Sequence, residues 1–527
     1  MYGVSDSVLK AALILCFWFC ISISANAESW HDKTLPEIAA GLAAGTVTSV
    51  QLVEEYLARI EAIDRSGPTL NAVLAINPNA LADAQRADRQ RQQGMVAGPL
   101  HGVPILLKDN IESLDPLATT VGSLSMVHNI VGRDAPLVAG LRAQGAIVLG
   151  KSNLSEWANF RSQTSMSGWS ALGGQTRNPH MLDRNPCGSS SGSGSGVAAS
   201  LAAGAVGTET NGSIICPSSV NGIVGFKPTV GLVSAEGIVP ISPTQDTAGP
   251  MSKSVMGAAM LLGAMDSADI DYPAALKGAD LTGVRIGVMR AFQGQDASIL
   301  PLFDRAIGVL AEQGAHVVEI TTAKPMPDGF QAAAFRVLLH EFKASLNQYL
   351  LTSKSKMRSL ADVIAFNRAS PRELLLFDQS IFLLAQETQG TQNKHYREAR
   401  ALISKATREE GIDYFLSEYE VDILIAPSGQ VAPRIDAVNG DIWADFAGIG
   451  WMAAIAGYPH ATVPIGTVRR LPIGISFIAS AGADLEVLKA AYVYEQVSKQ
   501  RVIPGYLPSA DAISEIARAL EPYSADD

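Results

Sequence analysis

Residues 185–219 read NPCGSSSGSGSGVAASLAAGAVGTETNGSIICPSS, and every residue between Gly188 and Gly196 is glycine or serine. Such a run is typical of a flexible linker, a loop that cradles phosphate, or a loop that presents a reactive serine. A linker is disfavoured because the run leads directly into VAASLAAGAVG, whose small apolar residues suit a closely packed helix. A phosphate cradle would require a closing Lys-Ser or Lys-Thr pair, or a GxGxxG pattern after a strand, and the run has neither. The reactive serine loop is the favoured interpretation.

The segments around this stretch alternate between helix and strand patterns. The apolar runs VPILL at 103–107 and AIVLG at 146–150 are typical of strands buried on both faces of a sheet. Capping-box spacing of Thr34 with Glu37 and of Thr48 with Gln51 predicts two helices near the start of the chain. Helices that alternate with buried strands indicate an α/β layer architecture.

The middle of the chain has a different texture. From about residue 269 to 419 the patterns are long and helical, with few glycine-rich turns. We expect this part to be a variable helical insertion or cap within a single domain of residues 28–527. Hydrophobic residues make up 47% of the chain and charged residues 17%, so a large buried core is expected.

The N-terminus has the pattern of a secretory signal peptide. Lys10 precedes an apolar run at 11–23, and small residues at Ala25 and Ala27 suit a signal peptidase. The run is too short to span a membrane, which needs about 20 residues. We expect cleavage after Ala27 and export to the periplasm or the medium, with no membrane attachment after cleavage.

Cleavage would leave two cysteines, Cys187 and Cys216, which flank the serine-rich segment. Two cysteines in a chain of this size do not form a disulfide framework, so free buried thiols are the expected state. A single bridge between them is the alternative.

The charge balance narrows the choice of partners. The chain has 40 Lys and Arg against 51 Asp and Glu, a net charge of −11. No block of basic residues provides the surface that a phosphate backbone requires, so nucleic acid is not expected as a partner. No His, Cys or Asp cluster has ligand spacing, and neither a metal nor an organic cofactor is expected.

Two serine arrangements remain. In the first, GSSSG at 188–192 matches G-x-S-x-G with Ser190 as nucleophile, and the base would be a later histidine. Four histidines follow, but none lies in a recognisable signature: His316, His340, His395 and His460. In the second arrangement, three segments act together, with Lys108 in HGVPILLKDN, Ser189 in CGSSSGSGSG and Ser213 in GTETNGSIICPSS.

These three segments, in this order, resemble the amidase signature family of serine hydrolases. AGYPHATVPIG and LPIGISFIA match the family's C-terminal pattern, so the resemblance covers nearly the whole chain after residue 27. KSNLSEWANFRS, SGWSALGGQTRNP and NPCGSSSGS are similar to its peptide amidase branch. The resemblance implies an α/β fold with a large central mixed β-sheet covered on both faces by α-helices.

The resemblance also implies a mechanism. Ser213 would attack the amide carbonyl to form an acyl-enzyme, Ser189, after a cis peptide bond, would relay its proton, and Lys108 would be the base. A neutral base requires a lysine pKa far below 10.4, and the position of Lys108 after a buried strand favours such a shift. Backbone N–H groups would hold the oxyanion, those of Thr210, Asn211, Gly212 and Ser213. Asn211 departs from the aspartate or glycine frequent in relatives.

The expected substrate is the C-terminal carboxamide of a peptide, with release of ammonia, or another small aliphatic or aromatic amide. Three other functions are weighed against it: a glutamyl-tRNA amidotransferase A-type subunit, a Ser-His-Asp hydrolase and a non-catalytic exported binding protein. The pattern favours none of these three. Trp157, Asn159 and Trp169 are further candidates for the substrate pocket, although structural packing explains them equally well.

Overall fold

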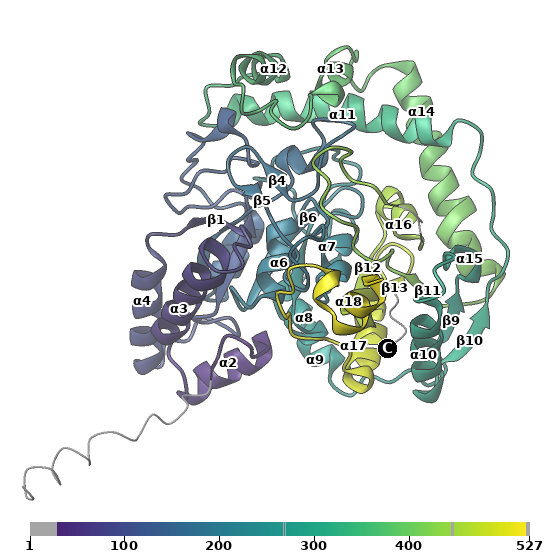
Figure 1. The fold of residues 1–527 in the computed structure, drawn as a ribbon, viewed down its shortest axis with the longest axis horizontal. Coiled ribbons are helices and arrows are strands. Elements are labelled where there is room, and N and C mark those ends of the chain that lie inside the picture. Colours follow the sequence, from purple (N-terminus) through teal and green to yellow (C-terminus); the bar gives the residue numbers. More distant parts are fainter. Residues whose placement is uncertain (1–28, 267, 269, 444–446, 523–527) are drawn as a thin grey trace, which may run out of the picture.

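A mixed sheet of eleven strands runs through the centre of the molecule in the computed structural model (Figure 1). The structure describes residues 29–266, 268, 270–443 and 447–522, so the predicted signal peptide lies outside the described residues. The strand order is β1-β3-β2-β6-β8-β7-β12-β13-β11-β9-β10. The strands are β1 Val73–Ile76, β2 Pro104–Lys108, β3 Ile147–Ser152, β6 Gly204–Glu209, β7 Val224–Lys227, β8 Thr247–Ser252, β9 Arg285–Val288, β10 His316–Glu319, β11 Ile423–Pro427, β12 His460–Val468 and β13 Leu471–Ile478.

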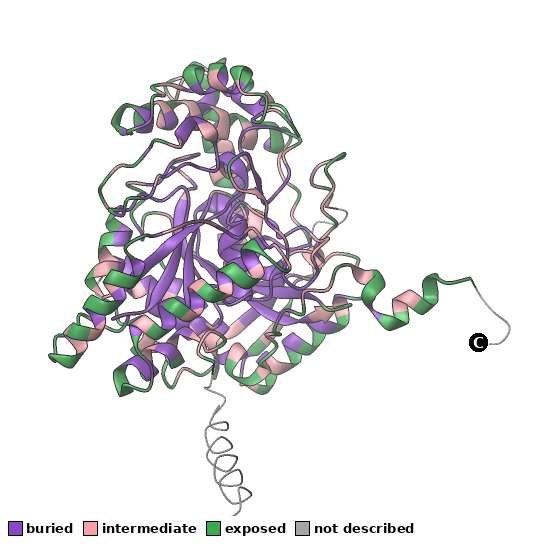
Figure 2. Ribbon diagram, turned by 60° about the vertical axis from the view of Figure 1, so that its left-hand side comes forward, coloured by how far each residue is buried: buried purple, intermediate pink, exposed green. Residues whose placement is uncertain are grey.

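Helices cover the sheet on both faces, which confirms the predicted α/β architecture. Figure 2 shows the buried residues gathered in the sheet and on the inner sides of the helices. The helices are α2 Leu35–Ala44, α3 Ser49–Arg59, α4 Ala80–Gln92, α5 Pro136–Ala143, α6 Ser191–Ala198, α7 Ile215–Val220, α8 Val255–Met265, α9 Tyr272–Leu276, α10 Leu300–Glu312, α11 Phe330–Thr352, α12 Leu360–Ala369, α13 Ser380–Gln386, α14 Lys394–Thr407, α15 Asp413–Glu418, α16 Gly450–Ala456, α17 Asp484–Ser498 and α18 Ser514–Leu520. A two-stranded ribbon pairs β4 Trp169–Ser170 with β5 Gly174–Gln175.

The local signals in the first part of the chain are confirmed. Both predicted capping boxes are present, at the starts of α2 and α3. The runs VPILL and AIVLG form β2 and β3, and every residue of these two strands is buried. Strands buried on both faces are continuous apolar runs because neither face meets water.

The glycine- and serine-rich run forms a buried helix, α6, which begins at Ser191 and ends at Ala198. The sequence predicted the helix further along, in VAASLAAGAVG at 197–207, but only the first two of these residues belong to α6, and a turn and then β6 follow. The helix begins earlier because its small residues allow very close contacts. A Cβ added at Gly192 would lie 2.2 Å from the carbonyl oxygen of Ala72. The run is therefore core structure.

The region 269–419 is mostly helical but also supplies part of the sheet. Helices α11 to α14 form a layer along the upper edge of the molecule in Figure 1. The strands β9 and β10 of the same region join one end of the sheet, where each pairs in parallel. The region is thus a helical cap together with two strands that extend the sheet.

The parallel pairing of β2 with β6 determines where functional groups can meet. Lys108 is the last residue of β2, and Glu209 is the last residue of β6. Because parallel neighbours end at the same edge of a sheet, Lys108 lies beside the loop that follows Glu209. That loop carries Ser213.

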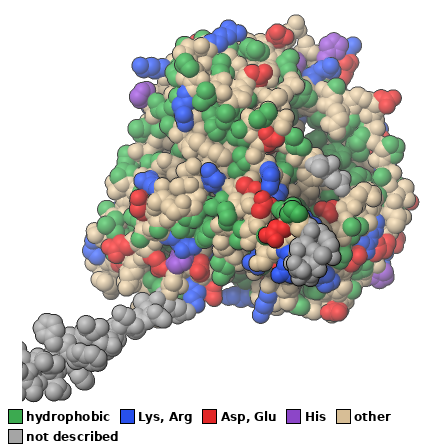
Figure 3. Space-filling view, viewed as in Figure 1, with side chains coloured by type: hydrophobic (Ala, Val, Ile, Leu, Met, Phe, Trp, Pro, Cys, Tyr) green, Lys and Arg blue, Asp and Glu red, His purple; other side chains and the backbone are tan. Residues whose placement is uncertain are grey.

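The surface carries no single dominant charge on the face seen in Figure 3, where acidic and basic side chains are interspersed. Within residues 29–522, apart from the few that are not described, no helix has the length and apolar character needed to cross a membrane.

Candidate active site

Lys108 lies at the end of β2 with its side chain fully buried. Its Nζ is 2.7 Å from Ser189 Oγ, 2.8 Å from Thr208 Oγ1 and 3.1 Å from the carbonyl oxygen of Thr208. Burial lowers the pKa of Lys108 to about 7, because the charged form loses its hydration, while the carboxylates of Asp246 and Glu209 oppose this shift. A large fraction of this lysine is therefore neutral near pH 7.

Ser189 is held in place by its backbone. The peptide bond between Gly188 and Ser189 is cis, and the carbonyl oxygen of Ser189 accepts a hydrogen bond from the Ser155 amide at 3.1 Å. A Cβ at Gly188 would lie 2.1 Å from Ser155 Oγ, so only glycine fits there without displacing a neighbour. The Ser189 hydroxyl thus faces Lys108 from a closely packed loop.

Ser190, the alternative nucleophile, has a different setting. Its Oγ donates to the carbonyl oxygen of Thr208 at 3.1 Å and accepts from the amide of the same residue at 3.2 Å. These contacts join α6 to β6, and no histidine is among them. The G-x-S-x-G arrangement with a histidine base is not formed within the described residues.

Ser213 lies on the loop after β6, next to the Ser189 loop. Its carbonyl oxygen accepts from the Ser190 amide at 3.2 Å, and the residue is 9% exposed. No hydrogen bond joins the hydroxyls of Ser189 and Ser213 within the part of the chain that the structure describes. Gly212 has φ of 80°, a conformation that favours glycine. The backbone N–H groups of residues 210–213 have no hydrogen-bond acceptor among the described residues.

Two carboxylates fix this loop from either end. Glu209 Oε2 accepts from the amides of Ile214 and Ile215, at 2.7 and 3.1 Å, at the start of α7. Asp246 Oδ1 accepts from Thr210 Oγ1 at 2.6 Å, and burial raises the pKa of Asp246 to about 6. Sequence reasoning missed Thr208, Glu209 and Asp246. Only Thr208 and Glu209 had a signal in the sequence, because they lie in the same segment, GTETNGS, as Ser213.

A disulfide joins Cys187 to Cys216, with the two Cα atoms 5.9 Å apart. The expectation of free thiols was therefore wrong. The two cysteines lie two residues before Ser189 and three residues after Ser213, so the folded loops bring them together although 29 positions separate them along the chain. The bridge fastens one serine loop to the helix that follows the other.

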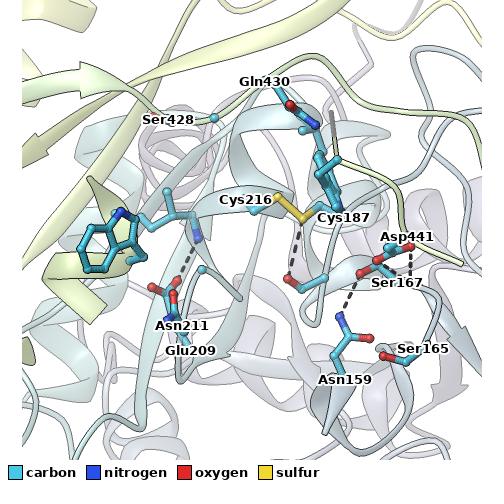
Figure 4. Close-up of a pocket in the computed structure, with 18 of the residues that line it drawn as sticks. Asn159, Ser165, Ser167, Cys187, Glu209, Asn211, Cys216, Ser428, Gln430 and Asp441 are labelled. Atoms are coloured by element: carbon cyan, nitrogen blue, oxygen red, sulfur yellow. Dashed lines mark hydrogen bonds between the residues drawn. A yellow bond between two sulfur atoms is a disulfide. The ribbon is translucent and has the colours of Figure 1, made fainter. Parts of the chain in front are cut away.

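A pocket of about 420 Å³ opens beside these loops. Gly188, Gly212 and the disulfide form part of its lining. In Figure 4 the disulfide lies between two walls, one with Glu209 and Asn211 and the other with polar residues that include Asn159, Ser167 and Asp441. A ligand in this pocket would lie next to the residues that flank both serines.

The aromatic candidates and Asn159 divide between core and pocket. Asn159 lines the pocket and donates to Ser167 Oγ at 2.8 Å. Trp157 packs edge-on against Phe382, and Trp169 packs edge-on against Phe377. Both tryptophans are buried packing residues.

The histidines are not arranged as bases for a serine. His460 lines the pocket, but its Nε2 is 2.7 Å from Ser476 Oγ, and burial lowers its pKa to about 3. His340 stacks on Tyr396, and His316 and His395 are exposed. Across the described residues, no group of three or more His, Cys, Asp or Glu side chains could hold a metal ion.

Comparison with known proteins gives matches of nearly full length. A family model described as Amidase matches residues 51–488. The solved structure of native peptide amidase from Stenotrophomonas maltophilia is 44% identical with a TM-score of 0.85, and the match covers 90% of this chain and 99% of that one. A probable amidase of Arabidopsis thaliana is 37% identical over 525 residues, 95% of this chain and 97% of the relative. The A-type subunit of glutamyl-tRNA(Gln) amidotransferase from Streptomyces avermitilis is 32% identical over 495 residues, 88% of this chain and 94% of the relative.

Proposed function

Because the chain belongs to the amidase family and is a hydrolase of amide C–N bonds, we propose that it removes the C-terminal carboxamide of peptides through an acyl-enzyme on Ser213. The observation that carries the proposal is the 2.7 Å contact between Lys108 Nζ and Ser189 Oγ. A fully buried amine with a lowered pKa beside a serine hydroxyl is a suitable acceptor for a proton.

In this proposal the contacts of Lys108 determine where the two N–H bonds of its neutral amine point. The carbonyl oxygen of Thr208 can only accept, so it takes one N–H of the amine, and Thr208 Oγ1 can accept the other. The lone pair of the neutral amine is then free for the Ser189 hydroxyl. Ser189 passes its proton to Lys108 and takes that of Ser213 as the Ser213 oxygen attacks. The proton then returns from Lys108 through Ser189 to the amide nitrogen, which leaves as ammonia when the acyl-enzyme forms.

The oxyanion of the tetrahedral intermediate is held by backbone N–H groups of Thr210, Asn211, Gly212 and Ser213 in this mechanism. Their lack of acceptors among the described residues supports this role, because preorganised donors stabilise a developing negative charge without reorganising. Since main-chain groups do this work, Asn211 changes only the side-chain surroundings of the loop.

Similarity to the Stenotrophomonas maltophilia peptide amidase supports a peptide amide as substrate, with 44% identity over most of both chains. Small aliphatic or aromatic amides are the second candidate substrates, because the same family includes enzymes for peptide amides and enzymes for small amides. The likeness to the amidotransferase relative rests on lower identity, 32%. Co-purification of two further subunits would favour that function.

We also propose that the protein is exported and that residues 1–27 are removed. The disulfide beside the serine loops supports export, because disulfides persist in oxidising compartments. Sequencing of the mature N-terminus from the native host tests this, and a retained Met1 in the cytosol would contradict it.

The substrate proposal is tested with one peptide in three forms: the C-terminal amide, the free acid, and the chain extended by one residue. Products are followed by mass spectrometry. We expect water to replace ammonia in the amide, which converts it into the free acid, while the other two forms stay intact. Ser213→Ala should form no acyl-enzyme and should not react with an active-serine phosphonate. Internal cleavage of the free acid, or fast hydrolysis of small amides with the peptide amide untouched, would contradict the proposal.

A further inference from the structure

The pocket beside the serine loops is acidic. Two carboxylates line it, Glu209 on one wall and Asp441 on the other (Figure 4), and none of its described lining residues is lysine or arginine. The third titratable side chain is His460, whose lowered pKa of about 3 leaves it neutral at pH 7. Like charges in a cleft with low-dielectric walls reinforce one another, so the pocket attracts cations and repels anions.

Asp441 is held in position by neutral donors. Its two oxygens accept from the Ser167 amide at 3.0 Å each, and Oδ1 also accepts from Asn185 Nδ2 at 2.7 Å. Burial raises the pKa of Asp441, and these hydrogen bonds limit the rise. The Ser167 and Trp443 side chains also donate to Asp441, so its acceptor positions are largely used, and this half-buried carboxylate offers the pocket its negative charge.

Glu209 adds a second carboxylate to the pocket, and the buried lysines Lys108 and Lys227 interact with it electrostatically. One of its oxygens holds the start of α7, and the other, Oε1, is buried without a hydrogen-bond partner among the described residues. The side chain is 1% exposed and makes no ion pair with any described residue. Its field therefore reaches the pocket with little screening by water, although the two lysines offset part of it.

We propose that Asp441 is a specificity-determining residue that holds a cationic group on the acyl side of the substrate. The substrate class is then amides whose C-terminal residue carries an ammonium or guanidinium group, as lysine and arginine do, and amides of acidic residues are disfavoured. This inference rests on the proposed function of the same site. A cationic group in a half-buried setting beside this carboxylate gains from charge attraction that water screens only weakly.

Asp441 has a structural alternative that the test must separate. Its bonds to Ser167 and Asn185 fasten its own loop to two other loops of the pocket, and a pure fastening role would affect all substrates alike. Asp441→Asn keeps the size of the side chain and an oxygen that can accept from the Ser167 amide, but removes the charge. Asp436→Asn is the matched control, because Asp436 lies on the same loop and does not line the pocket. Asp436 accepts bonds from Val438 and Asn439, and asparagine suits such turns equally well.

The experiment measures kcat/KM for three peptide amides that differ only in the C-terminal residue, which is lysine, norleucine or glutamate. Norleucine has the straight chain of lysine without the charge. For the unaltered mature protein we expect lysine to exceed norleucine by about tenfold, a fold-change within reach of one partly buried charge pair. Glutamate should be lowest. Asp441→Asn should bring the ratio of lysine to norleucine close to one, Asp436→Asn should leave it unchanged, and added salt should reduce it.

Two outcomes would overturn the inference. They are a ratio near one in the unaltered protein and a ratio that Asp441→Asn leaves unchanged, as an equal loss for all three peptides would. Hydrolysis of all three amides with equal efficiency removes only this inference. Absence of hydrolysis of any amide removes the proposed function as well.

Discussion

The end of β2 and the end of β7 each carry a fully buried lysine, and the two differ in what their amines contact. Burial lowers the pKa of Lys108 to about 7 and that of Lys227 to about 8. Lys108 Nζ meets the Ser189 hydroxyl, whereas Lys227 Nζ donates to the carbonyl oxygen of Pro228 at 2.9 Å. A carbonyl oxygen has no proton to give. Burial thus makes a lysine available as a base, and a neighbouring hydroxyl determines whether it can act as one.

The largest expected effect separates the two lysines. Lys108→Met should lower kcat/KM for a peptide amide by about 10²–10⁴-fold, the usual value of a positioned acid or base. Lys227→Met fills a similar volume without removing a proton acceptor from Ser189, so its kcat should stay within about tenfold of the unaltered protein. Steady-state kinetics on both purified variants, with circular dichroism to compare folding, checks this. Equal losses of kcat/KM in the two variants would contradict a special role for Lys108.

Removing the hydroxyl between the proposed base and the proposed nucleophile should have a smaller effect. Ser189→Ala leaves Lys108 buried and Ser213 in place, so we expect a loss of roughly 10²-fold with measurable residual turnover. The fraction of acyl-enzyme formed in a single turnover, read by intact-protein mass spectrometry, is the measurement. Full activity in Ser189→Ala would mean that Lys108 acts without the relay.

A smaller effect is expected from the disulfide, which holds the two serine loops together. Replacing both Cys187 and Cys216 by serine should lower the free energy of unfolding by about 2–4 kcal/mol. Activity should fall by roughly tenfold, because the serines lose their fixed separation. Denaturant unfolding and kinetics test both effects. A reductant should cause the same losses of stability and activity in the unaltered protein and should change nothing in the double variant. A reductant effect of equal size in both proteins would show that the losses do not come from the disulfide.

Removal of metal ions is expected to have no effect on activity. Because the proposed base is a lysine, dialysis against EDTA should leave kcat/KM unchanged. Atomic absorption on the dialysed protein serves as the control for metal removal. A loss that a divalent ion restores would contradict a lysine base.

Much of the site follows from local sequence patterns. Lys108, Ser189 and Ser213 could be placed because their three segments, in this order, resemble the amidase signature family. The capping boxes of α2 and α3 could be predicted because their hydrogen bonds lie within four consecutive residues.

The parts that could not be predicted depend on distant residues. The Cys187–Cys216 bridge depends on how two loops fold toward each other, and their spacing along the chain carries no such information. Asp441 comes from a loop more than 200 positions beyond Ser213, and nothing in its local sequence marks it. The addition of β9 and β10 to the sheet is likewise a long-range pairing that no helical pattern reveals.

The central claim is that Lys108 acts as a neutral base through Ser189, and the pH dependence of acylation tests it most directly. The rate of acyl-enzyme formation on Ser213, measured in single turnovers from about pH 5 to 10, should rise about tenfold per unit in acid, where the lysine is protonated. It should level off above an apparent pKa of about 7, the value that burial gives Lys108. Lys227→Met should keep this profile. An acylation rate that is flat across this range, or one that keeps rising to its alkaline end, would contradict the account.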